Sequence, residues 1–84
     1  MADFLRIPPE ALKDRIRVTL TGNSRAWVEN YQSIQEYSDR KVVLLGKGEQ
    51  VCVEGERLCM DYYTCDDMVI RGRIQKISVT ESNR

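Results

Sequence analysis

Hydrophobic and polar residues alternate along most of this chain, and this period of two constrains its fold more than any other feature. From Arg15 onward apolar residues recur at every second position, as in Ile16, Val18 and Leu20. Side chains two positions apart share one face of a strand, so the pattern predicts short β-strands with one buried face. The strand-like runs cover residues 16–20, 26–31, 34–37, 41–45, 51–53, 58–62, 68–70 and 74–79.

These runs predict an all-β fold of about seven or eight short antiparallel strands, arranged as a meander, a sandwich or a small barrel. Residues 7–14 instead predict a short helix, because Pro8 and Pro9 are tolerated in a first helical turn. With 84 residues the chain forms one domain. Its predicted parts are an N-terminal segment with the short helix (1–14), a β-rich domain (15–80) and a flexible tail (81–84).

Three glycines follow apolar runs at equivalent places. Gly22, Gly55 and Gly72 each come directly after a strand-like segment. Glycine there supplies the positive φ of a turn or a bulge. Ordinary hairpin turns are the favoured interpretation, and stacked strand-turn-strand repeats are the alternative.

The charge balance bears on partners. Thirteen basic and thirteen acidic residues give a formal charge of zero, which disfavours nucleic acid as a partner. Low net charge also removes the repulsion that keeps small proteins apart, so self-association through free sheet edges is an expected possibility. The longest apolar run, Val42 to Leu45, is four residues, too short for a transmembrane segment. With no secretory signal at the N-terminus, the expected location is the cytoplasm.

Few residues offer catalytic chemistry. The chain has no histidine, the commonest general base and metal ligand. The carboxylate pairs Glu54 with Glu56 and Asp66 with Asp67 fall in predicted turns, where solvated side chains are expected. The sequence therefore predicts a protein that is not an enzyme, with no catalytic, cofactor-binding or metal-binding residues.

The cysteines are the sharpest candidate site. Cys52, Cys59 and Cys65 are separated by six and then five residues, a spacing that matches no close zinc knuckle. A fourth zinc ligand would have to come from Asp66 or Asp67. Structural thiols are the favoured interpretation, and metal binding or an intermolecular disulfide are the alternatives.

Aromatic and basic residues suggest a second function. Together they could form a stacking platform for single-stranded nucleic acid; the alternative is that the aromatics fill the core of a β-rich domain. The residues concerned are Trp27, Tyr31, Tyr37, Tyr62, Tyr63, Arg25, Arg71 and Arg73.

Taken in order, several short stretches resemble the YabP/YqfC family of sporulation proteins, nearer to its YqfC branch. They lie at residues 7–10, 17–22, 28–31, 37–39, 48–56 and 66–74. One departure is Ile16, where members of the family often carry proline before the residue equivalent to Arg17. The Glu29-Asn30 pair and the glycines are the recognisable positions, and their expected purpose is backbone geometry.

The resemblance implies a role in building the spore of an endospore-forming bacterium, in the mother cell or associated with the spore. It implies no catalytic activity, cofactor or ligand-binding residue. From it we expect a non-enzymatic protein that contributes to assembly of the spore envelope through contacts with partner proteins, whose identity the sequence does not give.

Overall fold

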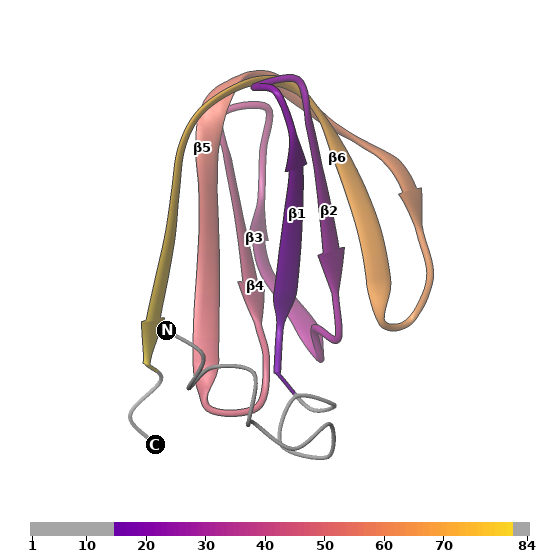
Figure 1. Ribbon diagram of the computed structural model, residues 1–84, viewed down its shortest axis with the longest axis vertical. Coiled ribbons are helices and arrows are strands. Elements are labelled where there is room, and N and C mark those ends of the chain that lie inside the picture. Colours follow the sequence, from indigo (N-terminus) through magenta and orange to yellow (C-terminus); the bar gives the residue numbers. More distant parts are fainter. Residues whose placement is uncertain (1–14, 82–84) are drawn as a thin grey trace, which may run out of the picture.

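Six antiparallel β-strands form a single sheet in the computed structural model, which describes residues 15–81 (Figure 1). The predicted all-β antiparallel class is confirmed. The predicted N-terminal helix lies outside the described residues. The strands are β1 (Arg17–Thr21), β2 (Arg25–Glu29), β3 (Ser33–Tyr37), β4 (Lys41–Leu45), β5 (Glu49–Tyr63) and β6 (Asp67–Glu81).

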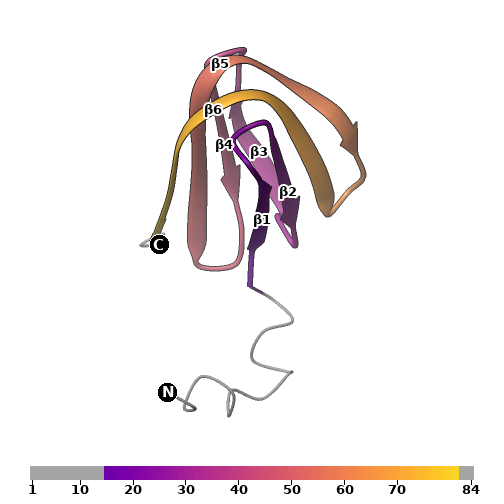
Figure 2. The same cartoon turned by 45° about the horizontal axis from the view of Figure 1, so that its top comes forward.

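The long hairpin of β5 and β6 organises the sheet, whose strand order is β1-β2-β6-β5-β4-β3. This hairpin arches over the molecule, and the short hairpins β1–β2 and β3–β4 lie beneath it (Figures 1 and 2). β2 pairs with residues 67–71 of β6, whereas β4 pairs with residues 50–54 of β5. The β2 half consists of β1, β2, residues 67–71 of β6 and residues 59–63 of β5. The β4 half consists of β3, β4, residues 50–54 of β5 and residues 76–81 of β6.

Two glycines let the backbones of β5 and β6 approach each other closely where this hairpin bends. A Cβ at Gly55 would lie 2.0 Å from the carbonyl oxygen of Arg73, and one at Gly72 would lie 2.5 Å from that of Arg57. The pairing shifts register between Glu54 and Gly55 and again before Cys59. Such bulges bend a strand without ending it.

The bend explains why the structure has six strands where the sequence predicts seven or eight. Residues 51–53 and 58–62 belong to one strand, as do 68–70 and 74–79. Of the three glycines after apolar runs, only Gly22 lies in a turn between two strands, with φ 55°. Gly72 has φ 141° inside β6. A glycine that permits close backbone contact and a glycine in a turn look alike in a sequence.

Short turns tie each small hairpin to the bend. The backbone N–H groups of Gly55 and Leu58 donate to the carbonyls of Arg40 and Asp39, in the β3–β4 turn. In the same way the N–H groups of Gly72 and Ile74 donate to the carbonyls of Ser24 and Asn23, in the β1–β2 turn. The two halves therefore repeat one arrangement about the bend.

The core lies under the arch, between the two halves. Its side chains come from alternate positions of the strands, as the period of two requires. Leu44 and Val53 of the β4 half pack in the same cluster as Val28 and Ile70 of the β2 half. The other buried members are Ala26, Tyr31, Val42, Val51, Leu58, Met68 and Ile74. Within residues 15–81 no helix is long and apolar enough to span a membrane.

Candidate functional site

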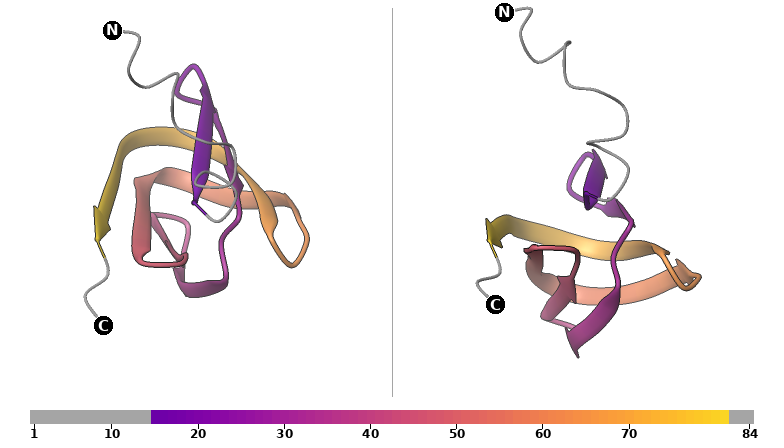
Figure 3. Two further views of the ribbon diagram at one scale, coloured as in Figure 1. Left: turned by 60° about the horizontal axis from the view of Figure 1, so that its bottom comes forward. Right: turned by 90° about the horizontal axis from the view of Figure 1, so that it is seen from below.

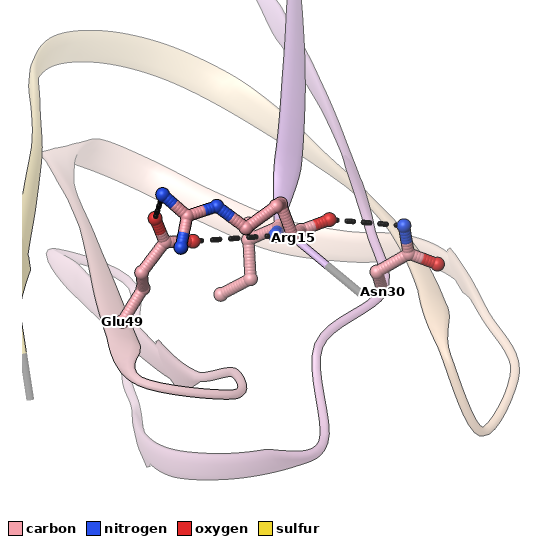
Figure 4. Close-up of polar contacts among 4 residues, drawn as sticks. Arg15, Asn30 and Glu49 are labelled. Carbon is pink, nitrogen blue, oxygen red and sulfur yellow. Dashed lines mark hydrogen bonds and ion pairs between the residues drawn. The ribbon is translucent and has the colours of Figure 1, made fainter. Parts of the chain in front are cut away.

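Polar contacts close the open end of the arch, opposite the bend. There Arg15 and Ile16, just before β1, meet the β2–β3 connection and the start of β5 (Figures 3 and 4). The carboxylate of Glu49 accepts the backbone N–H of Ile16 at 3.4 Å and pairs with the guanidinium of Arg15 at 3.4 Å. The side-chain amide of Asn30 donates to the carbonyl of Arg15 at 2.9 Å. These bonds fix the direction from which the chain enters β1.

Asn30 also turns the chain from one half to the other. Its φ of 69° is left-handed, a conformation that asparagine tolerates better than most residues. Its backbone N–H donates to the carbonyl of Asp66, and the N–H of Gln32 donates to that of Leu45. Of the Glu29-Asn30 pair, Asn30 serves backbone geometry, as expected, although its side chain bonds a residue fifteen positions away.

Tyr31 closes the core at this end. Its ring is buried, and its hydroxyl donates to the carbonyl of Thr64 at 2.6 Å. Burial raises the pKa of this hydroxyl, and the nearby Cys65 and Tyr63 add to the shift. The contacts of Arg15, Asn30, Glu49 and Tyr31 are those of a structural closure.

The outer face of the β2 half is the most distinctive surface. Cross-strand pairing places Thr19, Trp27, Val69 and Tyr62 in one row across four neighbouring strands. Trp27 and Tyr62 are 41% and 54% exposed. Large aromatic side chains at this exposure, on the face opposite the core, are typical of contact surfaces.

A second row runs beside the first, two residues nearer the bend. It contains Thr21, Arg25, Arg71 and Cys59, each paired with the next. Arg57 joins it from the bulge of β5, and these residues line an open depression of about 620 Å³. The sequence pattern does not indicate Arg57 as a site residue, because its place depends on a left-handed φ of 55° that nothing in the local sequence signals.

The predicted platform is partly assembled. Trp27, Tyr62, Arg25 and Arg71 share the outer face of the β2 half. Tyr31 is buried in the core instead. The Tyr37 hydroxyl, on β3, accepts the backbone N–H of Met60 at 3.0 Å.

The remaining members of the predicted platform are exposed. Tyr63 is 62% exposed at the end of β5. Arg73 lies past the bend, directly opposite Glu56.

The three cysteines lie apart in the fold and form no disulfide with one another. Cys59 is on the outer face of the β2 half, Cys52 is on β5 in the β4 half, and Cys65 is in the β5–β6 turn. Burial raises the pKa of the Cys52 thiol, and its hydrogen bond to Glu54 adds to the shift. No group of three potential metal-ligating side chains occurs among residues 15–81.

Of the four carboxylates predicted in turns, Asp66 lies in one, and the other three lie in strands. Glu54 and Glu56 lie inside β5, because Gly55 continues the strand. Asp66 is in the β5–β6 turn, where its carboxylate accepts the Thr64 hydroxyl at 3.2 Å, and Asp67 begins β6. Glu54 and Asp67 are half-buried and the other two are exposed.

The sequence pattern of the YabP family matches residues 13–84 of this chain. The chain belongs to the YabP family. It is also similar to the uncharacterized protein YqfC of Bacillus subtilis (strain 168), with 26% identity over 78 residues that cover 93% of this chain and 84% of that protein. No solved structure matches it.

Membership of the YabP family agrees with the resemblance drawn from the short stretches. Of the residues that mark it, Asn30, Gly55 and Gly72 occupy positions where the backbone geometry is demanding.

Proposed function

We propose that this YabP-family protein is a non-enzymatic sporulation protein, which contributes to assembly of the spore envelope through contacts with other proteins. The observation that carries the proposal is the aromatic row on the outer face of the β2 half, in which exposed Trp27 and Tyr62 flank the half-buried Val69. An aromatic row on a rigid sheet supplies contact area at small cost in conformational entropy, as interface hot spots do.

Free sheet edges offer a second means of assembly. Among residues 15–81, the part of β6 from Lys76 to Glu81 pairs only with β5, so its other side is one free edge of the β4 half. The second free edge is β3, the last strand of the sheet order. Free N–H and C=O groups on such edges can pair with a strand of another chain. Lys76 lies on this edge, and charged side chains discourage edge pairing. The aromatic face is therefore the stronger candidate for partner contact.

Deletion of the gene in its host tests the biological role. We expect fewer heat-resistant spores and altered envelope morphology in thin sections. A wild-type copy should restore both, whereas a Trp27→Ala, Tyr62→Ala double variant should not. Val79→Ala is the matched control, because Val79 is also exposed (56%) but lies in the β4 half, and shortening its side chain leaves the backbone N–H and C=O groups of that edge in place. Normal spores from the deletion strain under all conditions would contradict the role.

A pull-down from sporulating cells tests the mechanism. The wild-type protein should retain a defined protein partner, the Val79→Ala variant should retain the same one, and the double variant should lose it. Loss in both variants, or in neither, would remove the aromatic row from the proposal.

A further inference from the structure

We propose that the depression at the bend of the β2 half binds a phosphate group. Three arginines line it: Arg25 of β2, Arg57 of β5 and Arg71 of β6. The proposal does not depend on the role in spore assembly, and its test needs only the purified protein.

The first argument is the placement of like charges. Arg25 and Arg71 are directly opposite each other on paired strands. Like charges at such positions repel and destabilise a sheet. A dianion between them would turn this repulsion into attraction for both.

The second argument is the lack of balancing carboxylates. Arg71 pairs with Asp61 at 3.6 Å, with both side chains about half exposed. Within the described part of the chain, Arg25 and Arg57 make no ion pair with a carboxylate. Among the described residues, three arginines and no acidic residue line the depression, although the whole chain is neutral.

The third argument is the backbone at Arg57. A left-handed φ of 55° is uncommon for a residue other than glycine, asparagine or aspartate, and costs about 1 kcal/mol or more. The register shift between Glu56 and Cys59 sets this conformation. Because of this bulge, Arg57 does not follow the regular alternation of side chains along β5 and instead lines the depression.

The chemistry of the lining favours phosphate over a single carboxylate. Guanidinium groups donate paired hydrogen bonds that match phosphate oxygens, and several can share one phosphate group. Thr21 and Ser24 line the same depression. The Ser24 hydroxyl donates to the Thr21 carbonyl at 3.4 Å, so the Thr21 hydroxyl is the one offered to a further phosphate oxygen. Two sources supply this group: a soluble phosphate compound and the headgroup of an anionic lipid.

The test titrates the full chain with inorganic phosphate at low salt and follows backbone amide signals by NMR. We expect saturable shifts centred on residues 25, 57 and 71. Arg25→Gln and Arg71→Gln should each weaken binding by about tenfold or more, because a charge-assisted bidentate contact is lost. Arg17→Gln is the matched control: it removes the same charge from the same half, but Arg17 pairs with Glu29 at the far end of the strand. The affinity of the Arg17→Gln variant for phosphate should stay within about twofold of wild type, since exposed ion pairs contribute little.

Alkylation of cysteine gives an independent readout at the site. Cys59 lines the depression, whereas Cys65 is exposed in the distant β5–β6 turn. Bound phosphate should slow iodoacetamide modification of Cys59 several-fold and leave the rate at Cys65 unchanged. The two rates can be read in one sample by mass spectrometry.

Vesicles distinguish the two sources. Binding to phosphatidylcholine vesicles that contain phosphatidic acid, lost in Arg25→Gln and absent without phosphatidic acid, would assign the group to a lipid headgroup. Binding of phosphate with no vesicle binding would assign it to a soluble compound. The proposal is overturned if neither phosphate nor vesicles give a saturable response, or if Arg17→Gln weakens binding as much as Arg25→Gln. Retention of an oligothymidylate strand by a protein that ignores both probes would also overturn it, in favour of nucleic acid.

Discussion

The close approach of the β5 and β6 backbones at Gly55 leads to the most direct prediction about stability. A methyl group there would lie 2.0 Å from the Arg73 carbonyl oxygen, far inside contact distance. Because the obstacle is backbone and not a flexible side chain, the two long strands would have to separate. Separation would strain the hydrogen bond from the Gly55 N–H to the Arg40 carbonyl (3.0 Å) and the ladder beside it.

The expected cost of Gly55→Ala follows from these losses. Overpacking costs about 1–3 kcal/mol, and each weakened hydrogen bond about 1 kcal/mol. A total near 3 kcal/mol or more is a large share of the roughly 4–13 kcal/mol expected for a chain of 84 residues. At about 4–8 °C per kcal/mol, the Tm should fall by about 12–24 °C or more.

Gly22→Ala provides the control. Gly22 has a left-handed φ of 55° with nothing within 4 Å of the added methyl group. Its replacement should therefore cost about 1 kcal/mol, from the backbone conformation alone. Urea denaturation and thermal melts followed by circular dichroism measure both variants. A Gly55→Ala variant as stable as Gly22→Ala would show that the close backbone approach at Gly55 does not limit the size of the side chain there.

Three further changes test the closure and the core. Asn30→Gly keeps the left-handed backbone and loses only the bond to the Arg15 carbonyl, so Asn30→Ala should be less stable than Asn30→Gly by about 1 kcal/mol in urea; equal stability would contradict the role of φ. Tyr31→Phe should cost about 1 kcal/mol through loss of the bond to Thr64. Because the folded pKa of Tyr31 is raised above 10.0, its contribution is full below that pH and is lost as pH rises through the folded value. Wild type should therefore lose more stability than Tyr31→Phe between pH 9 and about 12 in urea midpoints, and parallel curves would argue against the burial effect. Leu44→Ala should cost about 2–5 kcal/mol by leaving a cavity under the arch, and a change below about 1 kcal/mol would place Leu44 outside the core.

Much of the fold could be read from the alternation of side chains. The runs at residues 41–45 and 51–53 supply Val42, Leu44, Val51 and Val53 to the core, because a period of two fixes which side chains share a face. The number of strands could not be read in this way. A bulge adds one residue to one strand, and whether a glycine ends the strand or bends it depends on what the partner strand does.

The candidate surface was foreseen only in part. Trp27, Tyr62, Arg25 and Arg71 were recognised as a set by residue type, but their register across β2, β6 and β5 places them together. Tyr31 was included in that set and belongs to the core. Aromatic residues suit both a core and a binding face, and the sequence around Tyr31 does not distinguish the two.

The sequence by itself determined that the chain forms pleated strands, which side chains share one face of a strand and which family the protein belongs to, because these depend on local periodicity and the order of short motifs. Only the tertiary structure decided that β5 and β6 are long, bent strands shared by two halves. It alone brought Arg57 to Arg25 and Arg71, since that meeting depends on a bulge in β5 and on the register that pairs Arg25 with Arg71, which lie more than forty residues apart in the sequence. The local propensity of a segment does not say which distant segment it pairs with. The close backbone approaches at Gly55 and Gly72 are part of what allows these pairings.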